Sequence, residues 1–204
     1  GNDFAGIDIE LIKEVLHRIG CEVVFVRLSF KRAIQELEHG SVDIIGSMLR
    51  SSRTDDFAYY PKHHHCVMFR MYVVSKKMGE HSTLEEFLAA GNRIVVPGNS
   101  SYGATIDDII SRYSSGVVKC KNVEIGLQML AKKHVEGIIL DPTVAKYHIE
   151  RLMPKNDSIS MIRAAPIYLG PPSKFYMLFS KHTVSSSIVA RYNEELGLMQ
   201  DRGE

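Results

Sequence analysis

Leu37-Glu-His-Gly-Ser-Val-Asp-Ile-Ile45 is the segment that indicates the fold class most clearly, together with its continuation Gly46-Ser-Met-Leu-Arg-Ser-Ser-Arg-Thr-Asp-Asp-Phe57. It contains the end of a helix closed by Gly40, then the apolar strand Val42-Asp-Ile-Ile45, then a polar segment with Arg53. Open α/β sheets bind their ligands beyond the carboxyl ends of their strands. The pattern therefore predicts an α/β fold with Arg53 at a ligand-binding edge.

A second stretch has the same form and ends in the opposite charge. Glu136-Gly-Ile-Ile-Leu-Asp141 has the pattern of a buried strand, and Asp141 is its last residue. The guanidinium fork of an arginine suits a carboxylate, and an aspartate suits an ammonium group. Arg53 and Asp141 together therefore predict a site for the two charged ends of a free amino acid.

Bulk composition excludes several other classes. The 204 residues fit one large domain or two lobes of roughly 100 residues each. A net charge of +1 gives no electrostatic reason to expect nucleic acid or an acidic membrane surface. No apolar run approaches the ~20 residues that cross a bilayer, and no signal peptide is visible at Gly1. Cys21, Cys66 and Cys120 are far apart, so they predict neither a zinc site nor a complete disulfide framework.

Helices and strands are predicted to alternate, which is typical of mostly parallel sheets covered by helices. The predicted helices are 9–19, 29–40, 83–88, a segment after residue 101, 123–133, 142–152 and 184–198. The predicted strands are 22–26, 42–45, 67–75, 93–96, 116–119, 136–140, 159–162 and 174–179. Because no linker separates the halves, we expect the chain to cross between two lobes near 72–76 and 168–174. The lobes would be residues 1–74 with 174–204, and residues 75–173.

Motifs spread over nearly the whole chain resemble one known family in their order and spacing. These motifs are Gly6-Ile-Asp-Ile-Glu-Leu11, Val23-Val-Phe-Val26, Phe30, Leu37 to Ile45, Arg53, Gly98-Asn-Ser-Ser-Tyr102, Gly126-Leu-Gln-Met-Leu130 and Gly137-Ile-Ile-Leu-Asp141. The chain thus resembles the polar amino-acid-binding proteins, the type II periplasmic binding proteins of bacterial ABC transporters (bacterial solute-binding protein family 3).

The resemblance implies two α/β lobes, each a mostly parallel sheet flanked by helices, joined by two crossing strands. The lobes would close over an amino acid by hinge motion, on the periplasmic or extracytoplasmic side of a membrane. The partner would be an ABC permease or the membrane domain of a receptor, and neither a cofactor nor a metal is expected. The family normally places a strand ahead of Asp8 and continues past the region of Gly203. We therefore expect one central strand and one wall of the pocket to be missing here.

The resemblance also implies which residues bind the ligand: Phe30, Ser47, Met48, Arg53, Ser100, Ser101, Tyr102 and Asp141. Arg53 would hold the α-carboxylate and Asp141 the α-ammonium. Ser100 and Ser101 would lie at a helix N-terminus, whose free N–H groups and partial positive charge suit a carboxylate. As an alternative, these serines are helix caps only. Asn99, next to them, stands where glycine is common in the family.

Two further matches concern the first lobe. Phe30 would be the aromatic residue that covers the ligand, although a lone phenylalanine more often belongs to the core. Ser47 and Met48 would lie in the loop that offers backbone groups to the ligand.

The two charged residues also have simpler roles to weigh. Arg53 alone fits a surface cation paired with Asp55 or Asp56, and Asp141 fits an N-cap. Arg50, in the same loop as Arg53, is either exposed to solvent or a contact for an acidic ligand side chain.

The run His63-His-His65 invites a metal interpretation that the sequence does not support. Neighbouring residues of a strand point to opposite faces, so at best His63 and His65 share one face. No Glu or Cys stands at a convincing spacing from them, and the sequence therefore predicts no metal site.

Catalysis finds little support. The sequence contains no Gly-x-Ser-x-Gly elbow, HExxH motif or Walker loop. Some proteins of this fold are cyclohexadienyl dehydratases with a carboxylic acid near the hinge, where this chain has Ser173-Lys-Phe175. A binding protein without catalytic residues is therefore the prediction. A cyclohexadienyl or arogenate dehydratase-like lyase is the alternative, and a degenerate domain used only for protein contacts is a third.

Overall fold

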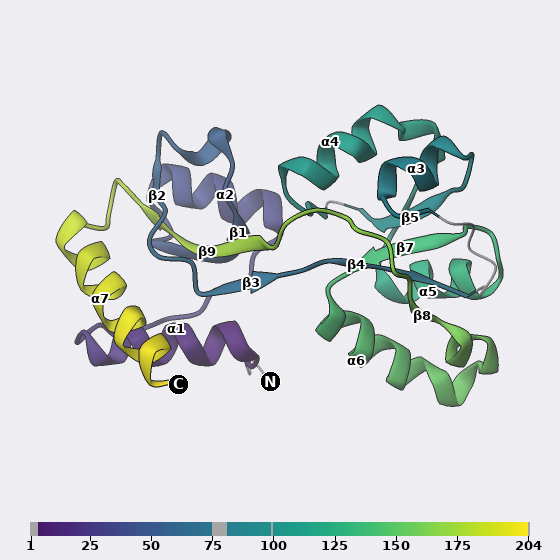
Figure 1. Ribbon diagram of the computed structural model, residues 1–204. Coiled ribbons are helices and arrows are strands. Elements are labelled where there is room, and N and C mark those ends of the chain that lie inside the picture. Colours follow the sequence, from purple (N-terminus) through teal and green to yellow (C-terminus); the bar gives the residue numbers. More distant parts are fainter. Residues whose placement is uncertain (1–3, 75–80, 99, 204) are drawn as a thin grey trace. The chain divides into compact units, whose positions relative to one another are not determined.

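The computed structural model describes residues 4–74, 81–98 and 100–203, except for the side chains of Ser52 and Lys155. The chain divides into two compact units. Unit 1 comprises Gly1–Cys66 and Lys174–Glu204, and unit 2 comprises Val67–Ser173 (Figure 1).

Unit 1 contains a four-stranded sheet built around the returning strand β9 (Ser173–Ser180). Strands β1 (Ile44–Leu49), β2 (Ala58–Tyr59) and β3 (His65–Val67) all pair with β9. The pairings of β1 and β2 are antiparallel, so the prediction of a mostly parallel sheet is wrong for this unit. The reason is that β9 comes back along the chain and runs between β1 and β2 in the opposite direction.

Helices cover both faces of β9. Helices α1 (Ile7–Arg18) and α7 (Ser186–Arg202) pack against each other and against the face that carries Met177 and Phe179. Helix α2 (Phe30–His39) covers the opposite face, where its Leu37 meets Leu178. Figure 1 shows α1 and α7 on one side of the sheet and α2 on the other. This alternation follows from the two-residue period of a strand.

The predicted strand 22–26 is not a strand in the structure. Its apolar alternation is real: Val23 and Phe25 pack against the cluster of α1 and α7, while Val24 is 88% exposed and Val26 64% exposed. A strand also needs hydrogen bonds to a neighbour, and no described strand pairs with this segment.

Unit 2 contains a five-stranded sheet with the strand order β6-β5-β7-β4-β8. The strands are β4 (Arg70–Val73), β5 (Ile94–Pro97), β6 (Val117–Cys120), β7 (Gly137–Leu140) and β8 (Arg163–Ala164). Strand β5 is parallel to β6 and β7, whereas β4 is antiparallel to β7 and β8. The single long strand predicted for 67–75 is two shorter ones, β3 and β4, and its last residue lies outside the described residues.

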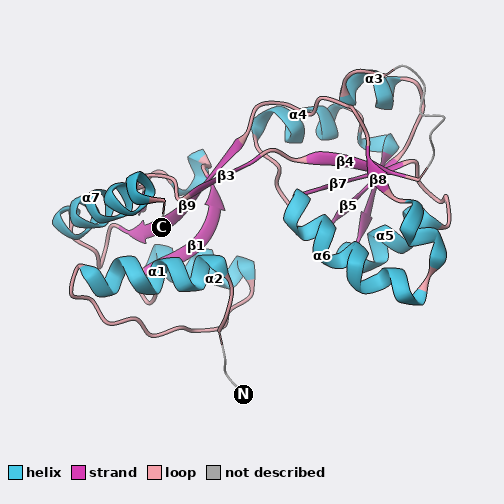
Figure 2. Ribbon diagram, turned by 60° about the horizontal axis from the view of Figure 1, so that its bottom comes forward, coloured by secondary structure: helices cyan, strands magenta, loops and turns pink. Residues whose placement is uncertain are grey.

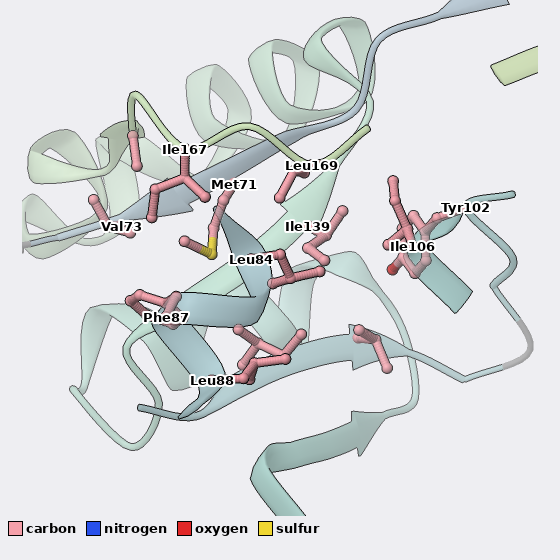
Figure 3. Close-up of a cluster of buried hydrophobic side chains, with 13 residues drawn as sticks. Met71, Val73, Leu84, Phe87, Leu88, Tyr102, Ile106, Ile139, Ile167 and Leu169 are labelled. Carbon is pink, nitrogen blue, oxygen red and sulfur yellow. The ribbon is translucent and has the colours of Figure 1, made fainter. Parts of the chain in front are cut away.

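Helices lie on both faces of this sheet (Figure 2). Helices α3 (Leu84–Ala89) and α4 (Ala104–Arg112) cover the face of Met71, Val73 and Ile139. Figure 3 shows these three side chains in one cluster with Leu84 and Phe87 of α3. Helices α5 (Val123–Ala131) and α6 (Pro142–Leu152) cover the other face. Within the described part of the chain, no helix is both long and apolar enough to cross a membrane.

Short 3₁₀ helices fill several connections: η1 (Ser52–Thr54), η2 (Ser114–Gly116), η3 (Met153–Lys155) and η4 (Asp157–Met161). The strand predicted for 159–162 is therefore wrong, because most of it is η4. The side chain of Asn156 accepts a hydrogen bond from the Ser158 N–H at 3.0 Å, and the Ser160 hydroxyl donates to the Asp157 carbonyl at 2.6 Å. Such local bonds favour a turn over a strand. Ile159 is nevertheless fully buried, which explains the apolar pattern.

Candidate functional site

Arg53 lies in η1, just beyond the end of β1, and it is exposed. The nearby acid Asp55 pairs with Arg50 instead, with 3.4 Å between Arg50 Nε and Asp55 Oδ1. Among the described residues, the Arg53 guanidinium takes part in no ion pair. The simpler role of a surface cation paired with Asp55 or Asp56 is therefore not what the structure contains.

A hydrogen-bonded network holds the turn that carries Arg53. The Thr54 hydroxyl, on a residue that is 4% exposed, donates to the Ser51 carbonyl at 3.0 Å. The Tyr60 hydroxyl accepts from the Ser51 N–H at 3.0 Å and also contacts the Thr54 hydroxyl. The backbone is thus fixed on both sides of Arg53. Sequence reasoning missed Thr54 and Tyr60 as positioning residues, since nothing in their local pattern marks this role.

The other predicted site residues of unit 1 lie in different surroundings. Ser47 has a left-handed backbone with φ 55°, at the point where the β1–β9 register shifts between Ile45 and Met48. Its hydroxyl lies 3.3 Å from His64 Nε2. Met48 packs against the cluster beneath α2, so its side chain is partly core. Phe30 is the first residue of α2 and is 55% exposed, so it is not a core residue.

In unit 2, the parallel strands bring three predicted residues to one edge. Ser100 and Ser101 follow β5, and Asp141 directly follows β7. Because β5 and β7 are parallel, their carboxyl ends meet at the same edge of the sheet. The exposed Ser100 and Ser101 therefore lie at the same sheet edge as the half-buried Asp141.

Asp141 is the N-cap of α6, as its position before Pro142 predicts. Its Oδ1 accepts from the Thr143 N–H at 2.6 Å and from the Val144 N–H at 3.2 Å. Among the described residues, Asp141 forms no ion pair, and both hydrogen bonds of its carboxylate go to Oδ1. The capping role therefore leaves the second carboxylate oxygen available for another group.

The start of α4 already has a carboxylate from the chain itself. Asp107 Oδ2 accepts from the Ser101 hydroxyl at 2.5 Å, and Asp107 Oδ1 accepts from the Tyr102 N–H at 2.9 Å. A ligand carboxylate at this helix terminus would have to displace Asp107 from Ser101, whereas Ser100 remains exposed. Asn99, the neighbouring departure from the family pattern, lies outside the described residues.

Tyr102 is a core residue of unit 2. It is 4% exposed, belongs to the cluster that contains Ile106, and meets Phe69 edge to face at 5.0 Å between ring centroids. Burial raises the pKa of its hydroxyl. The side chain of Tyr102 packs in the interior of unit 2, and its predicted ligand-binding role stays a prediction. Figure 3 shows it beside Ile106.

Two α/β units formed by a chain that leaves unit 1 and later returns to it define the type II periplasmic-binding-protein fold. The chain belongs to the bacterial extracellular solute-binding proteins, family 3, whose model matches residues 1–204. The predicted family and the two-unit α/β type II fold are thereby confirmed. This is a family of binding proteins, and its members are of the extracellular solute-binding type.

Solved structures with similar folds include both transport proteins and sensors. The probable amino-acid ABC transporter extracellular-binding protein ytmK of Bacillus subtilis has a TM-score of 0.76 at 18% identity, over 98% of this chain and 84% of that one. A histidine kinase sensor domain has a TM-score of 0.73 at 15% identity, over 96% and 80%. A mutant of ArgBP from T. maritima has 0.70 at 18%, over 98% and 82%. No curated protein sequence matches the chain.

Proposed function

We propose that this protein binds a free amino acid or a close analogue, with Arg53 holding the α-carboxylate and Asp141 the α-ammonium. The main support for the proposal is the exposure of Arg53 and the surroundings of its side chain. It is an exposed arginine on a turn fixed by hydrogen bonds, and the nearest acid of the sequence, Asp55, is taken by Arg50. A guanidinium on a fixed turn, with no ion pair among the described residues, suits a carboxylate that arrives from solution.

Asp141 supports the same ligand class from the other unit. Its carboxylate is half-buried, and one oxygen carries both capping hydrogen bonds. The cap therefore orients the group while the other oxygen remains for an ammonium. A single ligand held by Arg53 of unit 1 and Asp141 of unit 2 would stabilise a closed form, and we propose that the protein works by such hinge closure.

Other residues of the proposed site contribute by shape and polarity. Phe30 is exposed, which suits a platform against the ligand side chain, and the exposed Ser100 offers a hydroxyl at the sheet edge of Asp141. We assign backbone contacts to Ser47 and Met48, since the hydroxyl of Ser47 faces His64. We propose no catalytic residue and no cofactor.

Two settings suit a binding protein of this family. One is delivery of the solute to an ABC permease on the extracytoplasmic side of the membrane, periplasmic where a second membrane exists. The other is the sensor domain of a membrane receptor. The two solved structures with the highest TM-scores reported above include one of each kind, ytmK and the histidine kinase sensor domain. A permease gene next to this one would favour transport, and a membrane segment in the same chain would favour the receptor.

A thermal-shift screen against the twenty amino acids and their analogues tests the proposal. A ligand that binds only the native state adds about 2.7 kcal/mol at a hundredfold excess over its dissociation constant. We therefore expect a rise in Tm of several degrees with one chemical class of amino acid. Flat curves over the whole panel, at millimolar ligand, would contradict amino-acid binding. Turnover of prephenate or arogenate would instead establish the lyase.

A further inference from the structure

The fold of unit 1 brings a carboxylate and two imidazoles together from distant parts of the sequence. Asp8 is the second residue of α1, His65 is the first residue of β3, and His64 directly precedes that strand. Asp8 Oδ1 lies 3.3 Å from His64 Nε2 and 3.7 Å from His65 Nδ1. One potential ligand atom from each of the three residues lies within 4.8 Å of the other two.

These distances fit a small coordination sphere. Zinc binds imidazole nitrogen at about 2.0–2.1 Å and carboxylate oxygen at about 2.0–2.2 Å, so tetrahedral ligand atoms stand roughly 3.3–3.5 Å apart. The Asp8–His64 distance already matches, and the Asp8–His65 distance is slightly longer. Small side-chain adjustments would bring all three atoms into that range.

The simpler interpretation is a structural hydrogen bond between Asp8 and His64. That bond involves His64 alone, whereas His65 Nδ1 also lies 3.7 Å from the same carboxylate oxygen. His65 is also held in orientation, since its ring stacks on Phe175 with an interplanar angle of 8°. A cation would use both rings and the carboxylate at once.

The surroundings of the cluster suit a cation. Asp8 supplies a carboxylate whose Oδ1 faces both imidazoles, at 3.3 Å from His64 Nε2 and 3.7 Å from His65 Nδ1. The His64 side chain is 1% exposed, and its Nδ1 has no hydrogen-bond partner among the described residues. The Ser47 hydroxyl is a further oxygen beside His64 Nε2, at 3.3 Å.

We propose that Asp8, His64 and His65 form a binding site for a divalent first-row transition-metal ion, with Zn²⁺ as the best match. Imidazole and carboxylate together suit Zn²⁺, whereas Mg²⁺ and Ca²⁺ prefer sites built from oxygen alone. Three protein ligands leave a fourth position for water or the Ser47 hydroxyl. The ion would tie α1 to β3 and thereby stabilise unit 1.

The sequence prediction of no metal site rested on two points that the fold changes. It assumed that the three histidines lie on one strand, but β3 begins only at His65. It also sought an acidic partner near the histidines, whereas Asp8 lies 56 residues before His64 in the sequence (64 − 8 = 56). His63 is not part of the cluster, and its ring lies edge-on to Tyr176 at 6.2 Å between ring centroids.

Calorimetric titration of metal-free protein with ZnCl₂, together with thermal melts, tests this site. The wild type should bind one Zn²⁺ per chain with a rise in Tm, and MgCl₂ and CaCl₂ should have no comparable effect. Asp8→Asn keeps the shape but removes the anion, and His65→Ala removes a half-exposed ligand. Losing an outer partner of a metal ligand costs roughly 10–100-fold in affinity, so losing a ligand itself should cost at least that much.

His63→Ala is the matched control, because it shortens the same histidine run without touching the cluster. We expect this variant to bind Zn²⁺ like the wild type. If His63→Ala and His65→Ala weakened binding equally, the histidine run would be an adventitious surface chelator, and the proposal would fail. Absence of Zn²⁺ binding by the wild type, or wild-type affinity in Asp8→Asn, would also overturn it. Circular dichroism of each metal-free variant separates loss of the site from loss of folding.

Discussion

Arg50 Nε lies 3.4 Å from Asp55 Oδ1, so the first acid after Arg53 in the sequence is paired with the other arginine of the loop. Arg50 also lies over the ring of Tyr60, 5.3 Å from its centroid. The two arginines thus have different surroundings although only two residues separate them. Arg50 serves the local surface, whereas Arg53 forms no ion pair among the described residues, which suits the ligand role that we propose for it. This division makes Arg50 a matched control for Arg53.

The turn that carries Arg53 should depend on one hydroxyl. Tyr60→Phe removes the partner of the Ser51 N–H and of the buried Thr54 hydroxyl. Each lost hydrogen bond costs about 0.5–1.5 kcal/mol, so we expect the free energy of unfolding to fall by about 1–3 kcal/mol. We also expect weaker amino-acid binding. Urea denaturation and calorimetry measure the two effects.

Tyr59→Phe is the control for that change, because the Tyr59 hydroxyl makes no hydrogen bond among the described residues. Tyr59→Phe should leave the free energy of unfolding and the affinity for the amino acid within error of the wild-type values. Equal behaviour of the two variants would show that the network around Ser51 has no energetic role.

Asp107 should stabilise the start of α4. Asp107→Ala removes the acceptor of the Ser101 hydroxyl and the Tyr102 N–H, and we expect a loss of about 1–3 kcal/mol in the free energy of unfolding. Its neighbour Asp108 forms an exposed ion pair with Arg112 at 3.0 Å. Asp108→Ala should therefore cost only about 0–1 kcal/mol. Chemical denaturation distinguishes the two, and a larger loss from Asp108→Ala would refute this account of the helix start.

Substitution by alanine should change the stability of the protein differently at two helical glycines. A Cβ at Gly126 of α5 would lie 2.7 Å from Ile138 Cδ1 and 3.2 Å from Cys120 Sγ, whereas one at Gly197 of α7 would meet only the end of Lys62, at 3.3 Å. Alanine gains about 0.5–1 kcal/mol in a helix interior, but overpacking costs about 1–3 kcal/mol.

Gly126→Ala should therefore lower Tm, and Gly197→Ala should raise it or leave it unchanged. Differential scanning calorimetry of the two variants checks the signs. A rise in Tm for Gly126→Ala would mean that the contact between α5 and β7 is looser than these distances require.

Tyr192 should give the protein a stability loss at high pH. It is fully buried against Phe179, at 4.9 Å between ring centroids, and its hydroxyl has no hydrogen-bond partner among the described residues. Burial raises the pKa of this hydroxyl, so the folded state holds its proton more tightly than the unfolded state does. The stability from this group is thus fully present below the unfolded pKa of about 10 and is lost as pH rises further.

Tyr192→Phe keeps the ring and removes the titration. We expect stability at pH 7 equal to or above that of the wild type, because an unpaired buried hydroxyl is removed. Above pH 10 the variant should lose stability less steeply than the wild type. Parallel curves over that range, measured by urea denaturation at each pH, would count against a buried neutral Tyr192.

Local patterns in the sequence predict much of this fold. Helix α6 begins at Pro142 and ends at Leu152 as predicted, because Asp141 caps it and Pro142 suits its first position. Thr83 and Glu86 form a capping box at the start of α3, which begins within one residue of the predicted helix 83–88. These features depend only on residues within one helical turn of each other, so the local sequence is enough to predict them.

Features that depend on distant partners could not be predicted in this way. The apolar alternation of 22–26 is real, but a strand requires a neighbour that the local pattern does not contain. Tyr102 has an aromatic ring at a loop position, and only the packing of α4 shows that it belongs to the core. The approach of Asp8 to His64 likewise follows from how α1 packs in unit 1, not from any spacing in the sequence.

The most direct test of the amino-acid site is calorimetric titration of wild type, Arg53→Ala and Arg50→Ala with the amino acid that gives the largest thermal shift. Removing a buried arginine–carboxylate contact costs on the order of 2–5 kcal/mol, which is about 30-fold to several thousand-fold in affinity. We therefore expect Arg53→Ala to lose measurable binding while it remains folded, and Arg50→Ala to bind like the wild type. Unchanged affinity in Arg53→Ala would contradict the account.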